Sequence, residues 1–149
     1  MGKRILLVED NPDDADLALR ALRKGSVSDN VVVTHDGVET LEYLLGTGVA
    51  QRDLPPMPTF ILLDLKLPKI DGLEVLRRLR ASPRTSLVPI VILTSSREPQ
   101  DVLAAYRLGA NSYICKPVNF NHFAEAVRQA GRYWLNVNEM PPLEEVAAL

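Results

Sequence analysis

Residues 60–72 read Phe-Ile-Leu-Leu-Asp-Leu-Lys-Leu-Pro-Lys-Ile-Asp-Gly, and this stretch decides the fold. Its leading apolar residues are followed at once by an acid, Asp64, and then by a loop that contains Pro68. A short apolar run bounded by turn signals is typical of a strand buried on both faces. Asp64 would then lie at the carboxyl end of that strand, where open α/β sheets bind their ligands. Because an unpaired charge is costly in an apolar setting, this acid needs a partner or a chemical role.

The rest of the chain alternates apolar runs with helical patterns. Further strands are predicted at residues 5–8, 31–33, 89–93 and 113–115. Helices are predicted to begin near Asn11-Pro12, Asp36-Gly37, Asp71-Gly72 and Pro99, and a last helix carries Phe123, Val127, Ala130 and Trp134. Strands separated by helices pair in parallel through right-handed crossovers, so the pattern predicts an α/β fold of five strands and five helices. The pattern alone leaves the order of the strands open.

The composition excludes several classes of protein. A length of 149 residues suffices for one domain with a hydrophobic core. The net charge of -2 provides no large positive field for binding nucleic acid. The apolar runs are too short to span a membrane, and no signal-peptide pattern precedes the first strand. The single cysteine, Cys115, excludes an internal disulfide and fits a reducing compartment, so we expect a cytoplasmic protein.

Polar side chains follow four of the predicted strands at the point where each strand ends. Glu9 and Asp10 follow the first strand, Asp64 the third, Thr94 the fourth and Lys116 the fifth. The carboxyl ends of parallel strands lie at one edge of a sheet, so these groups can converge. Three neighbouring carboxylates repel one another unless a cation is present, and Mg²⁺ prefers carboxylate, carbonyl and water ligands. A carboxylate held by a metal and a lysine can attack phosphorus, which would form an aspartyl phosphate.

Taken together, these motifs resemble the receiver domain of two-component response regulators over nearly the whole chain. The matching pieces are Val8-Glu9-Asp10-Asn11, Leu63-Asp64 with Pro68 and Asp71-Gly72, Leu93-Thr94-Ser95, Tyr113, and Lys116-Pro117. The resemblance implies a flavodoxin-like, doubly wound parallel sheet with strand order 2-1-3-4-5. It also implies a switch that accepts a phosphoryl group from a sensor histidine kinase and assists its own phosphorylation and dephosphorylation, without being an enzyme for other substrates.

Roles carry over to the residues that match the family motif. The resemblance implies that Asp64 is the phosphoacceptor. It implies that Asp10 and Asp64 bind Mg²⁺ together with the main-chain carbonyl of Lys66, while Glu9 acts through water. Thr94 would hold the phosphoryl group.

The end of the fifth strand contributes the remaining family roles. Lys116 would hold the phosphoryl group together with the threonine, and Tyr113 would be the switch residue that turns inward when that threonine moves. The family also implies a cis peptide bond between Lys116 and Pro117. Taken singly, a threonine here can cap a helix and a tyrosine can be an ordinary strand aromatic. The resemblance to the receiver family therefore depends on all the motifs together.

The receiver pattern ends near Leu135, so we expect a receiver domain at residues 1–135 and a tail at residues 136–149 with no output domain. The long loop before the third strand and the Tyr133-Trp134-Leu135 ending are similar to the stand-alone regulators paired with cyanobacterial phytochromes and bacteriophytochromes. That likeness implies a light-sensing kinase as phosphodonor. It also implies a homodimer through the fourth helix, fifth strand and fifth helix, and an unknown downstream protein partner, with no direct contact to nucleic acid or membrane.

Two other functions would need features that this sequence lacks. A phosphatase of the haloacid dehalogenase type needs a second acid two residues after its nucleophile, where this chain has Lys66. A flavodoxin-like cofactor binder needs a phosphate-cradling loop after the first strand, but the acids around Pro12 would repel phosphate. Within the receiver family, a chemotaxis-type regulator and a phosphorelay intermediate stay open as alternatives.

Overall fold

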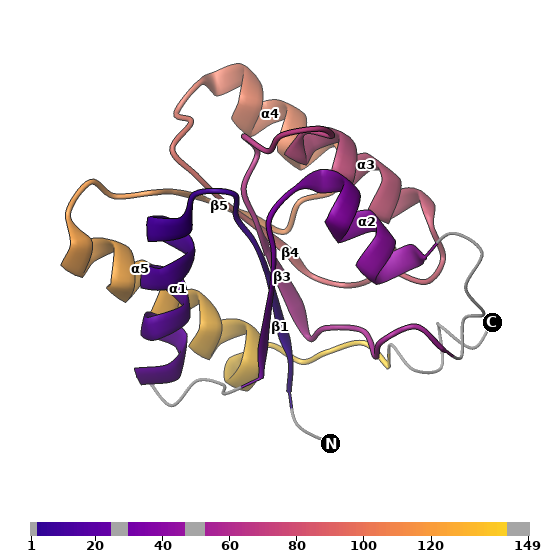
Figure 1. Ribbon diagram of the computed structural model, residues 1–149, viewed down its shortest axis with the longest axis horizontal. Coiled ribbons are helices and arrows are strands. Elements are labelled where there is room, and N and C mark those ends of the chain that lie inside the picture. The colour runs from indigo at the N-terminus through magenta and orange to yellow at the C-terminus, as the bar shows by residue number, and fades with distance from the viewer. Residues whose placement is uncertain (1–2, 25–29, 47–52, 143–149) are drawn as a thin grey trace.

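The computed structural model describes residues 3–24, 30–46 and 53–142, which form the predicted α/β fold (Figure 1). The strands are β1 (Ile5–Val8), β2 (Val31–Thr34), β3 (Phe60–Leu63), β4 (Ile90–Thr94) and β5 (Ser112–Cys115). The helices are α1 (Pro12–Lys24), α2 (Gly37–Leu45), α3 (Gly72–Ala81), α4 (Pro99–Arg107) and α5 (Phe120–Arg132), followed by a π-helical turn, η2 (Tyr133–Val137). All strand pairs are parallel, and the order β2-β1-β3-β4-β5 confirms the flavodoxin-like sheet that the resemblance implied.

Helices cover both faces of the sheet, with α1 and α5 on one face and α2, α3 and α4 on the other (Figure 1). Each face has its own core, because successive side chains of a strand point to opposite sides. Leu6 and Val8 of β1 pack in the cluster that contains residues of α2, α3 and α4. Ile5 and Leu7 pack in the cluster that contains residues of α1 and α5. Burial on both faces explains why β1 and β3 are uninterrupted apolar runs.

Side-chain caps fix the starts of the helices that follow β1 and β3. Asn11 Oδ1 accepts hydrogen bonds from the backbone N–H groups of Asp13 and Asp14, at 2.9 and 3.0 Å. Asp71 Oδ1 accepts the N–H of Glu74 at 3.0 Å. Such caps satisfy N–H groups that have no partner within the first turn, and each contributes about 1 kcal/mol. Consequently α1 and α3 begin at defined places beside the strand ends that carry the acids.

The last helix continues into the π-helical turn η2. Leu135 in this turn is buried, and Trp134 packs partly buried against the core shared by α1 and α5. The ammonium of Lys3 donates to the carbonyl oxygen of Leu135, which connects this turn to the segment before β1. The apolar end of the predicted tail, residues 143–149, lies outside the described residues. Within the part of the chain that the structure describes, no helix is long and apolar enough to span a bilayer.

Arg80 joins the end of α3 to the segments that flank β4 and β5. Its guanidinium donates to the carbonyl oxygens of Val88 at 2.7 Å and Gly109 at 2.9 Å, and to Asn111 Oδ1 at 2.8 Å. Asn111 Oδ1 also accepts the N–H of Ile90 at 2.8 Å. A planar fork with five donors can satisfy several carbonyls at once, which an ammonium could not do in this geometry. Arg80 therefore fixes two of the strands that end at the site.

Replacing Arg80 should destabilise the fold. We predict that Arg80→Met lowers the free energy of unfolding by about 2 kcal/mol, because several partly buried acceptors lose their donors. Arg78→Met is the matched control, because Arg78 lies two residues away, is exposed and pairs with Glu74 on the surface of the same helix. That change should cost no more than about 0.5 kcal/mol. Urea unfolding of both variants measures the difference, and equal losses would contradict the role given to Arg80.

Candidate functional site

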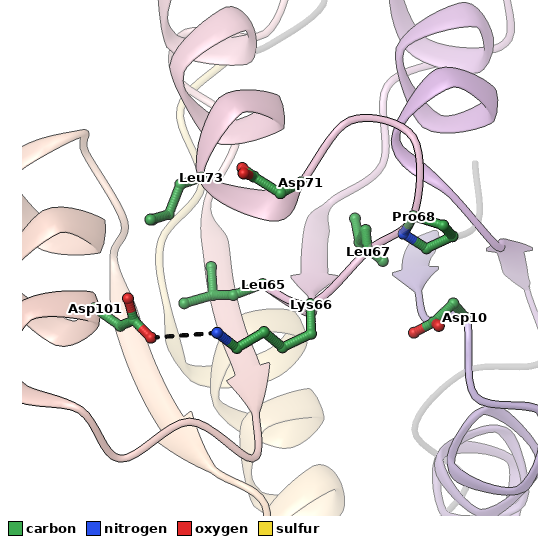
Figure 2. Close-up of a pocket in the computed structure, with 8 residues that line it drawn as sticks. All are labelled: Asp10, Leu65, Lys66, Leu67, Pro68, Asp71, Leu73 and Asp101. Atoms are coloured by element: carbon green, nitrogen blue, oxygen red, sulfur yellow. Dashed lines mark ion pairs between the residues drawn. The ribbon is translucent and has the colours of Figure 1, made fainter.

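A cavity of about 500 Å³ opens at the carboxyl edge of the sheet (Figure 2). Residues from the end of β1, the β3–α3 loop, the start of α3 and the first turn of α4 line it: Asp10, Leu65, Lys66, Leu67, Pro68, Asp71, Leu73 and Asp101. Lys66 Nζ and Asp101 Oδ2 lie 3.7 Å apart and form an ion pair across one side of it (Figure 2). The cavity is therefore at the edge where the sequence predicted the strand ends to converge.

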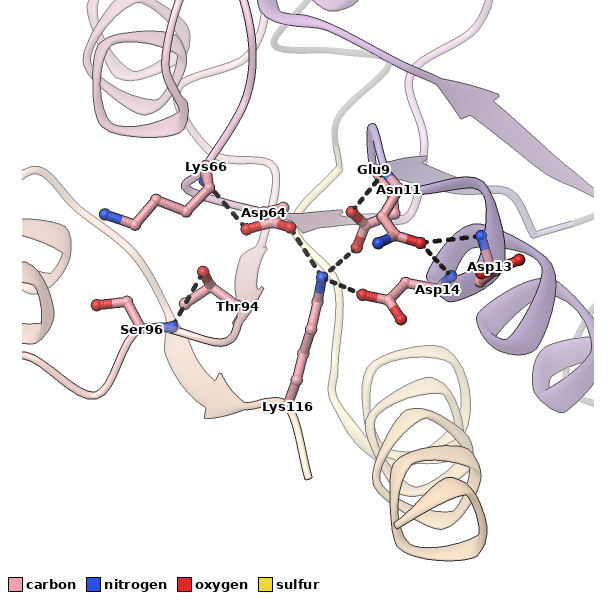
Figure 3. Close-up of polar contacts among 9 residues, drawn as sticks. All are labelled: Glu9, Asn11, Asp13, Asp14, Asp64, Lys66, Thr94, Ser96 and Lys116. Carbon is pink, nitrogen blue, oxygen red and sulfur yellow. Dashed lines mark hydrogen bonds and ion pairs between the residues drawn. The ribbon is translucent and has the colours of Figure 1, made fainter. Parts of the chain in front are cut away.

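Beside this cavity, the ammonium of Lys116 gathers three acids from different elements (Figure 3). Lys116 Nζ lies 2.6 Å from Glu9 Oε1, 2.8 Å from Asp64 Oδ2 and 2.9 Å from Asp14 Oδ2. Glu9 follows β1, Asp64 follows β3, Lys116 follows β5 and Asp14 stands in the first turn of α1. The structure thus brings together three of the predicted site residues and adds Asp14 to them.

Burial gives these acids different proton affinities. Burial raises the pKa of Glu9 from its ordinary 4.5 to about 7, against the opposing effect of the Lys116 hydrogen bond. Burial would also raise the pKa of Asp64, but hydrogen bonds from Lys116 and from the N–H of Lys66 outweigh it and lower that pKa. Likewise, burial would lower the pKa of Lys116, but the neighbouring acids raise it. Asp64 is therefore the charged member of the buried carboxylate pair at neutral pH, with a charged ammonium beside it.

The acids at the ends of β1 and β3 have the chemistry of a cation site. Glu9, Asp10 and Asp64 each place a carboxylate oxygen within 4.8 Å of the other two. A cluster of carboxylate oxygens suits a hard divalent cation, and one ammonium leaves its negative charge in excess. The N–H of Lys66 donates to Asp64 Oδ1 at 3.1 Å. This bond keeps the backbone of Lys66, whose carbonyl oxygen is the predicted metal ligand, close to the acid cluster. The donor set present therefore fits a divalent cation.

Gly72 holds the β3–α3 loop close to the end of β3. Its N–H donates to the carbonyl oxygen of Leu65 at 2.9 Å. A Cβ atom at this position would lie 2.3 Å from the carbonyl oxygen of Asp64 and 2.5 Å from the Cα of Leu65. Both neighbours are backbone atoms, so they could not move aside without displacing the strand end. The glycine in the sequence motif is thus required by a close approach of two backbone segments.

Thr94 and Tyr113 meet at the loop that follows β4. Thr94 is fully buried, and its Oγ1 lies 3.5 Å from the N–H of Ser96. The hydroxyl of Tyr113 donates to the carbonyl oxygen of Ser96 at 3.0 Å, and Ser96 Oγ donates to Asp101 Oδ2 at 2.6 Å. The loop is therefore held from β5 by Tyr113 and from α4 by Asp101. A displacement of Thr94 would be passed directly to both elements.

Two residues that the sequence pattern did not single out complete the arrangement. Asp14 bonds Lys116, and Asp101 joins Lys66 to Ser96. An acid in the first turn of a helix is already explained by the helix dipole, so the sequence contained no signal that set either apart.

One expectation about the backbone is wrong. The family implied a cis peptide bond between Lys116 and Pro117, but the described residues contain no cis peptide bond. The trans form is favoured even before proline, and with a trans bond here Lys116 still reaches all three acids.

Comparison with known proteins agrees with this geometry. Residues 5–128 match the model of the response regulator receiver domain. The chain belongs to this family. The match spans every strand and reaches into α5, so the receiver fold and the acid cluster belong to the same unit.

Relatives cover nearly the whole receiver. The probable methanogenesis regulatory protein FilR2 of Methanothrix harundinacea is 39% identical, over 92% of this chain and 86% of its own length. The structure of the phosphorylated cyanobacterial phytochrome response regulator RcpA is 36% identical with a TM-score of 0.87, covering 95% of this chain and 99% of that chain. The Mn²⁺-bound structure of response regulator Rcp1 is 34% identical with a TM-score of 0.85, covering 93% of this chain and 99% of that chain.

The raised pKa of Glu9 makes the stability of this receiver depend on pH. Between its ordinary 4.5 and about 7, the folded chain binds a proton at Glu9 that the unfolded chain has lost. The stabilisation from protonated Glu9 is therefore complete below pH 4.5, and it is lost as the pH rises through the folded-state pKa of about 7. Without divalent cations, we predict that the free energy of unfolding falls by up to about 3 kcal/mol between pH 5 and pH 8.

Glu9→Gln should remove most of this slope, because the amide cannot release a proton. Glu98→Gln is the matched control, since Glu98 is exposed and its side chain makes no capping hydrogen bond. Urea unfolding at a series of pH values measures the slope for both variants. A slope in Glu9→Gln equal to that of the wild type would contradict the assignment.

Proposed function

We propose that this receiver accepts a phosphoryl group on Asp64 from a histidine kinase and signals through a changed protein-binding surface. The observation that supports this best is the position of Asp64, a buried and charged carboxylate 2.8 Å from Lys116 Nζ and next to Glu9 and Asp10. A charged carboxylate is a ready nucleophile. Positive charge and hydrogen-bond donors around it are what a phosphoryl group needs during transfer.

In the proposed step, an oxygen of Asp64 attacks the phosphorus of a phosphohistidine on the kinase. A new oxygen–phosphorus bond forms while the nitrogen–phosphorus bond breaks, and the imidazole leaves with the electron pair of that bond. The ammonium of Lys116 offsets charge on the phosphoryl oxygens, and the hydroxyl of Thr94 donates a hydrogen bond to one of them. The attacking oxygen is already charged, so the step needs no general base.

Mg²⁺ is the cation that we propose for the acid cluster. Glu9, Asp10, Asp64 and the carbonyl oxygen of Lys66 would hold it, in keeping with the oxygen ligands that this ion prefers. When bound, Mg²⁺ supplies positive charge that offsets the charge of the transferred oxygens. Lys116 alone does not balance the carboxylates already present, so the anionic donor depends on a second positive charge.

The proposed output begins at the loop after β4. Phosphorylation exchanges the single negative charge of the Asp64 carboxylate for up to about two on the phosphoryl group, which draws the hydroxyl of Thr94 toward it. The backbone of Ser96 moves with Thr94, so the hydrogen bond from Tyr113 to the Ser96 carbonyl is lost and Tyr113 turns inward. The populations of the conformations of the α4–β5–α5 surface then shift, and a partner protein binds one conformation more tightly than the other.

The proposal also covers the domain bounds, the cellular location and the kinase that donates the phosphoryl group. Residues 1–135 would act as the receiver and residues 136–149 as a tail, in a cytoplasmic protein that regulates partners and catalyses no reaction on other substrates. We propose a phytochrome-type kinase as the phosphodonor, a choice supported by the likeness to RcpA. Transfer of phosphate from such a kinase, compared between red and far-red light, tests this choice.

The phosphoacceptor is tested by intact mass. We predict that acetyl phosphate with Mg²⁺ adds one phosphoryl group to the wild-type protein, that the adduct is base-labile, and that it needs the metal. Asp64→Asn should form no adduct, because an amide is not a nucleophile toward phosphorus.

Asp71→Asn is the matched control for this variant. Asp71 lies in the same loop, lines the cavity and caps α3, and asparagine caps helices about as well as aspartate. It should be phosphorylated like the wild type. An adduct that persists in Asp64→Asn, or that is lost equally in Asp71→Asn, would contradict the assignment of Asp64.

We also propose that the α4–β5–α5 face is a homodimer interface. Leu103 and Tyr106 expose about half of their surface on α4, next to the strand that carries Tyr113. Leu103→Asp should therefore halve the mass measured by sedimentation equilibrium, because burying the new charge at an interface is costly. Leu87→Asp is the control, since Leu87 is equally exposed but precedes β4 at the other end of the strand. A monomeric wild type, or equal effects of both variants, would contradict this interface.

A further inference from the structure

The ammonium of Lys116 uses all of its hydrogen-bond donors. An ammonium has three N–H groups, and Lys116 Nζ has three carboxylate acceptors, on Glu9, Asp64 and Asp14, between 2.6 and 2.9 Å away. Its side chain is only 9% exposed, so water supplies few alternatives. Any new acceptor at Lys116 must therefore replace one of these three.

The three acceptors differ in how easily they can be released. The side chains of Glu9 and Asp64 are 2% and 6% exposed, and an acid left without its cation there would be poorly hydrated. The side chain of Asp14 is 30% exposed, so water can solvate its carboxylate when the ammonium leaves. Asp14 is therefore the partner that Lys116 can release at least cost.

We propose that Asp14 is a positioning residue that competes with the phosphoryl group for Lys116. This inference rests on the proposed phosphoacceptor function, with Asp64 Oδ1 as the attacking oxygen. Asp64 Oδ2 then stays beside Lys116 after transfer, and a phosphoryl oxygen becomes the fourth acceptor. Before phosphorylation, Asp14 holds the ammonium toward α1. After phosphorylation, Lys116 exchanges Asp14 for the phosphoryl oxygen, and the first turn of α1 loses its bond to β5.

The local structure singles out Asp14 from its neighbour. Asn11 Oδ1 caps the backbone N–H groups of both Asp13 and Asp14, so both acids are fixed in the same turn. Only the carboxylate of Asp14 is directed at Lys116, as Figure 3 shows. Asp13 is exposed, so it provides a comparison with the same charge on the same turn but without the contact.

The test is the affinity of the protein for beryllofluoride, a stable mimic of the phosphoryl group, at saturating Mg²⁺. Calorimetric titration compares the wild type with Asp14→Asn and Asp13→Asn, each of which removes one negative charge from the first turn of α1. We expect Asp14→Asn to bind beryllofluoride about two- to fivefold more tightly than the wild type, the effect of a partly exposed ion pair that no longer has to be broken. Asp13→Asn should bind as the wild type does.

A second readout separates competition from a merely structural role. A double-mutant cycle of Asp14→Asn with Lys116→Met, measured by unfolding without beryllofluoride, should show that the two side chains are coupled. A structural role alone would change the unfolding free energy and leave the beryllofluoride affinity as it was.

The outcomes distinguish the two proposals. Equal affinities of the wild type and Asp14→Asn would overturn the competition and leave the phosphoacceptor function standing. Equal tightening in Asp14→Asn and Asp13→Asn would also overturn it, because the effect would then be one of general charge. Failure of beryllofluoride to bind the wild type with Mg²⁺ would overturn the proposed function and this inference together.

Discussion

At the carboxyl edge of the sheet, the single ammonium of Lys116 faces more carboxylates than it can neutralise, and the rest of the site depends on this imbalance. Lys116 contacts Glu9, Asp14 and Asp64, and Asp10 lies within the same acid cluster. One positive charge cannot balance four acids. Burial raises the pKa of Glu9 to about 7, while hydrogen bonds from Lys116 and from the N–H of Lys66 outweigh burial and lower the pKa of Asp64. The excess of carboxylate oxygens therefore fits a divalent cation, which would add positive charge to the cluster.

The fold supplies this constraint through its parallel sheet. Apolar runs buried on both faces bring β1, β3, β4 and β5 side by side, so their carboxyl ends meet at one edge. Close backbone contact at Gly72 keeps the β3–α3 loop against Asp64, and Arg80 fixes the segments that flank β4 and β5. The loop after β4 then links Thr94 to Tyr113 and to α4. Arg80 thus holds β4 and β5 at their amino ends, and the polar residues of the site stand at the carboxyl ends of the same strands.

Much of this was predictable from the sequence because strand ends and helix caps have local signals. The sheet was predicted from the apolar runs and from the caps at Asn11 and Asp71, and its site edge from the polar residues after four of the strands. The strand order came from the family resemblance. The contacts of Asp14 and Asp101 could not be predicted, because they depend on how α1 and α4 pack against the sheet. The spacing of residues in the sequence does not determine those packing angles. The bond before Pro117 has the trans form that peptides generally favour, whereas the family motif implied the cis form.

The excess of carboxylates at the strand ends calls for a divalent cation. The most direct measurement is the free energy of unfolding as a function of Mg²⁺ concentration, at constant ionic strength, for the wild type and Asp10→Asn. We expect the wild type to gain about 2.7 kcal/mol when Mg²⁺ reaches a hundred times its Kd, and Asp10→Asn to gain less at the same concentration. An unfolding free energy that does not change with Mg²⁺ in the wild type would contradict it.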